Sequence, residues 1–501
     1  MTDTGDDIFP EQEDLEVAPK RPITVRTAAI VGVRVFAGLV GLGVAAVTIA
    51  ASALLPIPTI RATPQGVLVT PVPTAQQLVC PGAVLRLSDD SGAGATIPSA
   101  IGQASVRFES SSGSVDSYPF EASDAGTAGT TAAPSIISTP PNQADPTERV
   151  LLSAAQAESV DEGDYVGLAA TDCAVASGDA WLAAGSTAVG RTTLLTLNNP
   201  TEVAATVTIE LFGETGTIRA PGTSGIIVPA SGQRIISLAG FQPGVQSPVV
   251  HVRSTGGQVV AGLQQSTVRG LDPGGVDLIG PTSSPSTENV IPGVLVTDLA
   301  GLQALRGGGI GYDDLSTTLR FFAPGSGTVS LTVSVIPADG QATGDSFVLD
   351  IEAGRVTDVA LDELETGSYT VRVDSTAPVI ATARVSSASG PATDFAWLTS
   401  APPLRESVQF TTAPGPSPVL HLANPGTTDA TVALTASDGD DLHVVVAAGS
   451  AAVVAIMAGV TYQLTGFDRL FAAVTLADSG MIAGYPVRPP GVGSSPITVY
   501  P

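Results

Sequence analysis

The hydrophobic and polar positions divide the chain into one long apolar run and many short alternating runs. Val35–Leu55 is an uncharged, mainly apolar run of 21 positions. One helix needs ~20 such residues to cross the hydrocarbon core of a bilayer. Four basic residues precede the run and only Arg61 follows it closely: Lys20, Arg21, Arg26 and Arg34. We therefore predict a single-pass transmembrane helix with a cytoplasmic N-terminus and extracytoplasmic C-terminal domains.

The segments that flank this run predict a tail and a stalk. Residues 1–34 are acidic and lack apolar periodicity before the run, so we expect a disordered cytoplasmic tail. Residues 56–77 are rich in proline and predict an extended stalk. The alternative is a cleaved signal peptide, since Ala51–Ala53 fits a small-x-small cleavage site. The long lead-in and the long apolar run favour a retained signal-anchor.

Beyond residue 78 the runs alternate with the period of strands, and they recur three times. The openings of the three copies are 192–200, 317–325 and 418–426, and a Val/Thr-rich strand follows each at 203–211, 328–336 and 430–436. Two alternating runs then flank Gly232, Gly354 or Gly449, which predicts a hairpin in each copy. A further hairpin ends each copy, at 249–262, 370–384 and 472–484.

The spacing of the copies predicts the fold class. The turn prolines Pro200, Pro324 and Pro425 are 124 and 101 residues apart, about the length of an immunoglobulin domain. We therefore predict an all-β protein of tandem immunoglobulin-like β-sandwich domains. The expected boundaries are an N-terminal β domain with a long loop at 78–190, repeats at 191–285, 286–404 and 405–490, and a C-terminal tail at 491–501.

The net charge limits the classes of binding partner, and the cysteine content bears on the cellular compartment of the chain. The net charge of −26 disfavours nucleic acid and anionic lipid surfaces, which need clustered Lys and Arg, and it favours solubility. Cys80 and Cys173 are the only cysteines, and both lie on the predicted extracytoplasmic side. They predict one disulfide, the alternative being two free buried thiols.

Trp181 and Trp397 each lie in a short apolar motif next to a repeat, and 276–279 fills a similar place before the second copy. A tryptophan here could stack on a carbohydrate. Its replacement by aliphatic residues in one copy favours packing in a core or between domains instead.

Several short motifs resemble one family: Cys80–Gly82, Cys173, 179–181, 185–187 and 195–200. With the N-terminal anchor, they look like those of uncharacterised, membrane-anchored, extracytoplasmic proteins of high-GC Gram-positive bacteria. The resemblance implies an envelope location and supplies no catalytic residues.

Residues for catalysis and metal binding are scarce. His251, His421 and His443 fall in predicted strands and are expected to be ordinary face residues. Lys20 is the only lysine and lies in the predicted cytoplasmic tail, which excludes an extracytoplasmic Ser–Lys dyad. No zinc or nucleotide motif occurs. We therefore predict no catalytic residue, no cofactor and no metal site.

The best remaining candidates for metal ligands are carboxylates in the third copy. Asp438, Asp440 and Asp441 lie on a predicted loop and are weak calcium candidates. Asp and Gly also favour turns for backbone reasons alone.

These observations favour a non-enzymatic, membrane-anchored envelope protein that acts as a scaffold or binding module for a cell-wall glycan or an envelope protein. The alternatives are a carboxylate-based extracytoplasmic glycan hydrolase and a surface sensor that recruits a partner through its cytoplasmic tail.

Overall fold

The structure is a computed structural model of the chain. It describes residues 25–54, 67–69, 75–87, 98–125, 133–142, 150–308, 311–338, 344–405, 407–490 and 497–499. The chain forms two compact units, one of Met1–Val69 with Thr498–Pro501 and one of Thr70–Ile497, and each is described by itself.

The first unit contains the N-terminal helix. Helix α1 (Val25–Leu54) covers the predicted span except for Leu55, which lies outside the described residues. Strands β1 (Val67–Val69) and β34 (Ile497–Val499) pair as a two-stranded sheet. Across the described part of the chain, no helix is both long enough and apolar enough to traverse a bilayer. The transmembrane anchor and the single-pass topology therefore stay predictions. Residues 1–24 of the predicted tail, 56–66 and 70–74 of the predicted stalk, and 491–496 and 500–501 of the predicted C-terminal tail also lie outside the described residues.

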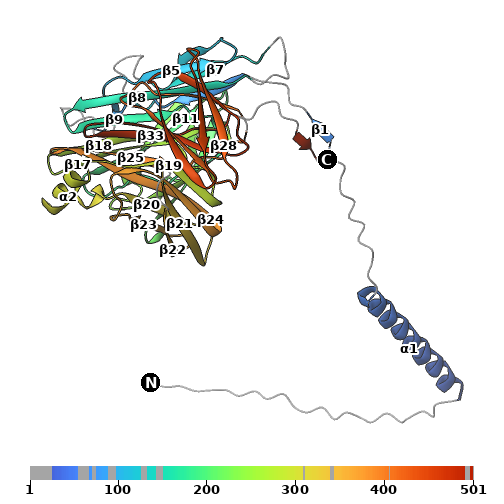
Figure 1. The fold of residues 1–501 in the computed structure, drawn as a ribbon. Helices are drawn as coiled ribbons and strands as arrows, with labels where there is room; N and C mark the ends of the chain where they lie inside the picture. Colours follow the sequence, from blue (N-terminus) through green and yellow to red (C-terminus); the bar gives the residue numbers. More distant parts are fainter. Residues whose placement is uncertain are drawn as a thin grey trace, which may run out of the picture. The chain divides into compact units, whose positions relative to one another are not determined.

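The second unit is almost entirely β, which confirms the all-β prediction (Figure 1). Among its described residues, helices are limited to α2 (Leu299–Gly308) and two short 3-10 turns, η1 (Leu238–Gly240) and η2 (Asp313–Leu315). Its strands group into four successive modules, which we number from the N-terminus.

The second module has two sheets with the orders β10-β16-β12-β13, where β14 also pairs β12, and β15-β11-β17-β18. Its strands are β10 (Asp179–Leu182), β11 (Arg191–Asn199), β12 (Ala205–Gly213), β13 (Gly216–Ile218), β14 (Ile226–Val228), β15 (Gly232–Ser237), β16 (Val249–Gly256), β17 (Val260–Arg269) and β18 (Asp272–Ile279).

The fourth module repeats this order as β26-β31-β28-β29 and β30-β27-β32-β33. Its strands are β26 (Val408–Thr411), β27 (Val419–Asn424), β28 (Ala430–Ala436), β29 (Asp441–Val446), β30 (Ser450–Ala455), β31 (Thr461–Thr465), β32 (Phe471–Asp478) and β33 (Met481–Pro486).

The third module repeats this strand order, but one long strand, β24, takes the place of two strands of the other modules. The first part of β24 pairs β19 and β21, and its last part pairs β20 and β25. Strands β22 and β23 lie at the two ends of the resulting seven-stranded sheet, whose order is β22-β21-β24-β20-β23. The strands are β19 (Ser286–Val296), β20 (Thr318–Phe322), β21 (Thr328–Pro337), β22 (Asp345–Glu352), β23 (Val356–Ala360), β24 (Gly367–Ser389) and β25 (Ala392–Thr399).

The first module is a shorter version, with sheets β2-β7-β6 and β5-β8-β9 and a separate β3-β4 pair. Its strands are β2 (Gln76–Cys80), β3 (Leu85–Arg86), β4 (Ser99–Ala100), β5 (Ser105–Ser110), β6 (Asp116–Pro119), β7 (Ser135–Thr139), β8 (Leu152–Glu162) and β9 (Tyr165–Asp172). The shared strand order makes it a fourth copy, one more than the sequence repeat indicates.

Five of the six predicted hairpins are wrong, and one is confirmed. The runs on either side of Gly232 and of Gly449 belong to different sheets, and those on either side of Gly354 lie at opposite ends of one seven-stranded sheet, so none of these pairs is a hairpin. The segment 249–262 comprises β16 and β17, which belong to different sheets, and 370–384 lies within the single strand β24. The segment 472–484 is the antiparallel pair β32–β33, which confirms the hairpin predicted there. Alternation shows that a segment has one buried face, but it does not identify the strand's partner.

The last strands of the four modules form a closed ring in which β9 contacts β18, β18 contacts β25, β25 contacts β33, and β33 contacts β9. Figure 1 shows these four strands near the middle of the unit. Each also packs into the core of a neighbouring module. Phe395 and Trp397 of β25 join the core of the second module, Ile482 of β33 joins that of the third, and Leu168 of β9 joins that of the fourth. The modules therefore interlock, because the main cores of the second, third and fourth modules each include residues of a neighbouring module.

The tryptophans confirm the packing interpretation. Trp397 is 3% exposed in the core of the second module, and Trp181 is 8% exposed against Phe322 and Ile380 of the third. Their predicted equivalence is wrong, because Trp181 lies in a first strand and Trp397 in a last strand. The domain boundaries themselves stay predictions.

Candidate functional site

A buried carboxylate joins the four last strands at the centre of the ring. Asp394 in β25 accepts backbone N–H bonds from Leu168 in β9 at 2.9 Å, Val276 in β18 at 3.2 Å and Ile482 in β33 at 3.1 Å. Burial raises the pKa of Asp394 to about 8. One side chain therefore ties its own module to the three others.

Asp277 in β18 has a related role. Its Oδ2 accepts the backbone N–H of Trp397 at 2.7 Å. Burial raises the pKa of Asp277 well above its ordinary value, and the nearby Asp394 raises it further. Both carboxylates are fully buried, so they hold strands together and do not face a ligand.

A cavity with a volume of about 420 Å³ lies where segments of the first, second and fourth modules meet. Cavities that bind small molecules typically have ~300–1,000 Å³. Its wall is formed by residues of β2, β8, β10 and β26 and by the segments 172–177, 281–284 and 485–490. Because these segments are far apart in sequence, only the closed ring creates the cavity.

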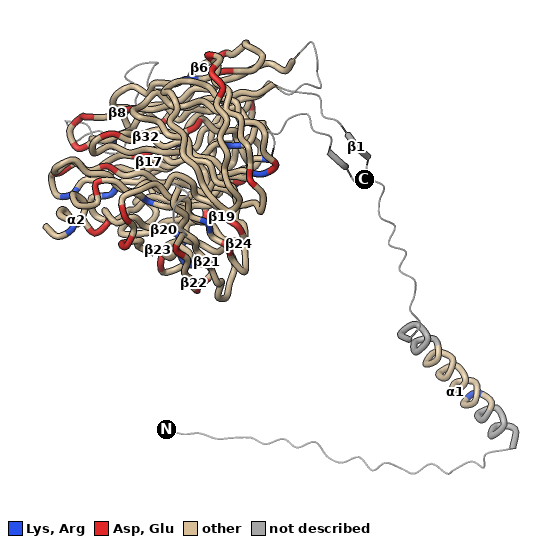
Figure 2. The backbone as a smooth tube through the Cα atoms, in the orientation of Figure 1, with Lys and Arg blue, Asp and Glu red and all other residues tan. Residues whose placement is uncertain are grey.

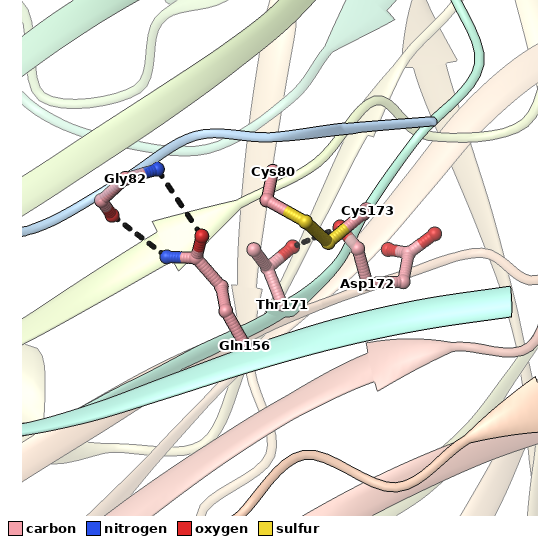
Figure 3. The surroundings of a disulfide bond; sticks show 6 residues. All are labelled: Cys80, Gly82, Gln156, Thr171, Asp172 and Cys173. Carbon is pink, nitrogen blue, oxygen red and sulfur yellow. Dashed lines mark hydrogen bonds between the residues drawn. A yellow bond between two sulfur atoms is a disulfide. The ribbon is translucent and has the colours of Figure 1, made fainter. Parts of the chain in front are cut away.

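The disulfide stabilises one wall. Cys80 and Cys173 are bonded, which confirms the predicted pair, and Cys173 lines the cavity (Figure 3). On the neighbouring strand, Gln156 accepts from the Gly82 N–H at 3.1 Å and donates to the Gly82 carbonyl at 2.7 Å. These contacts fix the chain that follows Cys80 on the first module.

Polar contacts join the first and fourth modules at the same wall. Arg488 pairs with Asp172 at 2.6 Å and donates to the Pro281 carbonyl at 2.7 Å. The Gln409 amide donates to the Glu109 carbonyl at 2.9 Å and to the Ser153 hydroxyl. The side chains that close the ring therefore also form the cavity.

Asp179 lies at another part of the lining, next to a histidine. His251 Nε2 is 2.8 Å from Asp179 Oδ2, and His251 Nδ1 is 3.0 Å from Glu210 Oε2. The Trp181 ring stacks on the imidazole with centroids 3.8 Å apart. Each ring nitrogen of His251 therefore faces one carboxylate oxygen. The Asp179 side chain is still 55% exposed.

The calcium candidates lie elsewhere. Asp438 and Asp440 are on the turn between β28 and β29, Asp441 begins β29, and all three are exposed. None lines the cavity. Within the described ranges, no three His, Cys, Asp or Glu side chains are grouped as a metal ion would require.

The remaining histidines occupy ordinary strand positions. His421 in β27 is buried between the hydroxyls of Ser368 at 3.1 Å and Thr475 at 2.7 Å, and burial lowers its pKa to about 4. His443 is exposed in β29. Neither lines the cavity.

Asp314 forms an ionic cluster with three arginines. Burial alone would raise the pKa of Asp314, but Arg384, Arg269 and Arg191 lower it to about 2. This carboxylate joins the second and third modules. Figure 2 shows acidic positions at several separated places along the described chain of the second unit.

Sequence reasoning missed Asp394, Asp277, Asp172, Asp179 and Arg488. The only signal was a pair of acidic residues inside apolar last strands, at 276–279 and 394–398. A buried strand seldom carries a carboxylate without a partner, so these positions indicate an internal acceptor.

The comparisons with known proteins identify a family but no activity. The profile of the Family of unknown function (DUF5719) matches residues 124–456, well over half of the chain. No curated protein matches the chain.

Proposed function

Since the chain belongs to this family of unknown function, we propose its role from the structure: a non-enzymatic, membrane-anchored envelope protein that binds a cell-wall glycan or an envelope protein. The cavity of about 420 Å³ is the observation that carries this proposal. Its lining comes from several modules, so a bound ligand contacts parts of the protein that are held in one fixed arrangement.

The ring supports a binding role because it pre-organises the cavity. The shared cores and the contacts of Asp394 fix the modules before a ligand arrives. A preformed site loses little conformational entropy on binding. We propose that the modules are immunoglobulin-like sandwiches, whose connecting segments commonly bind ligands while the sheets supply rigidity.

The proposed location is the cell membrane, with the N-terminus in the cytoplasm and the modules outside. The apolar run Val35–Leu55 supports it, and so does the Cys80–Cys173 disulfide, because such bonds persist in oxidising compartments. The four cytoplasmic basic residues set the proposed orientation.

Site-specific crosslinking in intact cells tests the binding role. A photoreactive amino acid replaces Val175, which lines the cavity and is 45% exposed. The matched control replaces Val348 on β22, which is 70% exposed and outside the cavity. We expect an envelope protein or glycan adduct from position 175 only. Equal adducts at both positions, or none, would overturn the proposal.

A carboxylate-based glycan hydrolase is the second candidate, because both Asp172 and Asp179 line the cavity. A glycosidase needs two carboxyl groups ~5–10 Å apart, one as acid and one as base or nucleophile. Asp172 is already paired with Arg488. Incubation of the purified chain with cell-wall glycan decides between the two, because only the hydrolase releases new reducing ends.

A further inference from the structure

Two adjacent residues in the cavity wall have backbone groups that are not used by the fold. Ala174 exchanges backbone bonds with Val79, and Ser177 exchanges them with Val259. Between these anchors, Val175 and Ala176 make no backbone hydrogen bond to any part of the chain that the structure describes. The wall therefore offers a short backbone edge, which is held at both ends by isolated β-bridges and has no backbone partner in the middle among the described residues.

From this edge we infer that the cavity binds an extended, cationic and apolar peptide segment of a partner protein, an inference that rests on the proposed binding function. An extended peptide pairs with free N–H and C=O groups at a strand edge, as in β-strand addition. Alternate side chains of such a peptide point to the same side, into the cavity.

The rest of the lining favours apolar side chains over sugar hydroxyls. Several prolines line the cavity and cannot donate a backbone hydrogen bond; they are Pro281, Pro402, Pro486, Pro489 and Pro490. The donors of Gln409, Tyr485 and Arg488 are already bound to Glu109, Thr411 and Asp172 respectively. A glycan would find few of the donors that its oxygens require.

The aromatic residues of the wall also favour a peptide over a glycan. Trp181, Phe410 and Tyr485 are 8%, 5% and 4% exposed, so their ring faces are packed inside the protein. A sugar ring stacks on an open aromatic face, and these rings do not supply one. The wall does offer apolar area for the side chains of a peptide.

The charges of the cavity lining favour a positively charged peptide. Asp172 is neutralised by Arg488, whereas Asp179 shares only one oxygen with His251 and stays 55% exposed. A Lys or Arg of the peptide can pair with Asp179, and the chain's net charge of −26 attracts such a segment.

Fluorescence anisotropy with the full chain and labelled probe peptides tests this inference. The probe is a blocked hexapeptide of alternating valine and arginine. The comparison ligands are the same peptide with glutamate in place of arginine, the arginine peptide with N-methylated backbone, and chitohexaose as a competing glycan. We expect the arginine peptide to bind, and the two altered peptides to bind at least ten-fold more weakly.

Two variants locate the binding. Asp179→Asn removes the charge, and Val175→Pro removes an N–H that has no partner in the described chain, so neither breaks a backbone bond of the fold. Each should weaken the arginine peptide at least ten-fold. Asp161→Asn, an exposed carboxylate outside the cavity, is the matched control and should change nothing. An unchanged melting temperature verifies that each variant folds.

The outcomes separate this inference from the proposed function. Binding of chitohexaose without the peptide, or equal binding of the glutamate peptide, overturns the inference and leaves a binding cavity. No binding of any probe also overturns it. Failure of the proposed function is recognised independently, when crosslinking at Val175 in cells gives no adduct.

Discussion

Replacement of Asp394 by asparagine tests whether the carboxylate at the centre of the ring holds the four modules together. The carboxylate accepts three backbone N–H bonds, from Leu168, Val276 and Ile482. Asparagine keeps one acceptor oxygen and puts an NH₂ group in place of the other. The amide oxygen can accept the N–H bonds of Leu168 and Ile482, which both go to one oxygen of the carboxylate. The N–H of Val276 then loses its acceptor.

The expected loss of unfolding free energy follows from the number of backbone N–H groups that lose their acceptor. A buried group left without its partner costs ~1–3 kcal/mol. We expect Asp394→Asn to lower the free energy of unfolding by about 2–3 kcal/mol, since the amide NH₂ also opposes the Val276 N–H. Asp394→Ala leaves three N–H groups unpaired and should cost ~3–9 kcal/mol, a large part of the ~5–15 kcal/mol by which proteins are stable.

Burial also gives this site a defined pH dependence. The pKa of Asp394 is about 8 in the folded protein, against an ordinary value of 3.8, so the folded state keeps a proton that the unfolded state releases. Stability then falls as pH rises towards 8, by ~1.4 kcal/mol per pH unit for one group. His421, whose pKa is lowered to about 4, acts in the opposite direction below pH ~6.5. The informative window is therefore pH 6.5 to 8.

Urea unfolding at several pH values measures both effects. Asp350→Asn, an exposed residue of β22, is the control and should stay within ~0.5 kcal/mol of the parent protein. Asp394→Asn should be less stable, and its slope between pH 6.5 and 8 should be shallower by up to ~1.4 kcal/mol per pH unit, whereas the buried Asp277 and Glu158, whose pKa values are also raised by burial, keep their contributions. Equal stability and equal slope in the Asp394→Asn and parent proteins would refute the reasoning.

Three further outcomes are expected. Cys173→Ser opens a disulfide that spans 93 residues and should lower the unfolding free energy by ~4–5 kcal/mol, seen as a lower urea midpoint that reductant does not change further. Arg488→Met leaves Asp172 without its partner and should cost ~2–4 kcal/mol, and the double variant with Asp172→Asn should recover part of this; a double variant as unstable as the single one would contradict the pairing. Calcium chelation should leave the melting temperature unchanged, because Asp440 and its neighbours are exposed and not grouped around an ion, and calorimetric calcium binding that Asp440→Asn abolishes would contradict this.

Much of the fold could be predicted from the sequence because strands alternate locally. The openings of the three repeats correspond to β11, β20 and β27, and the Val/Thr-rich runs correspond to β12, β21 and β28. The disulfide could be predicted because only two cysteines exist. The first module is predicted as an N-terminal β domain but not as a fourth copy, since its strands share an order with the others but no clear sequence motif.

The candidate site could not be predicted in the same way. Asp172 and Arg488 are 316 residues apart, and nothing local indicates that they pair. Val175 and Ala176 look like an ordinary connection, and their free backbone groups become meaningful only when the other cavity walls are in place.

The sequence by itself determined which segments become strands, which face of each is buried, and that one disulfide forms, because these depend on residue type and short-range periodicity. Only the tertiary structure decided which strands pair, that the last strands form a ring, and that a cavity opens where the first and last modules meet. Those features depend on contacts between residues hundreds of positions apart, which alternation along the chain does not encode.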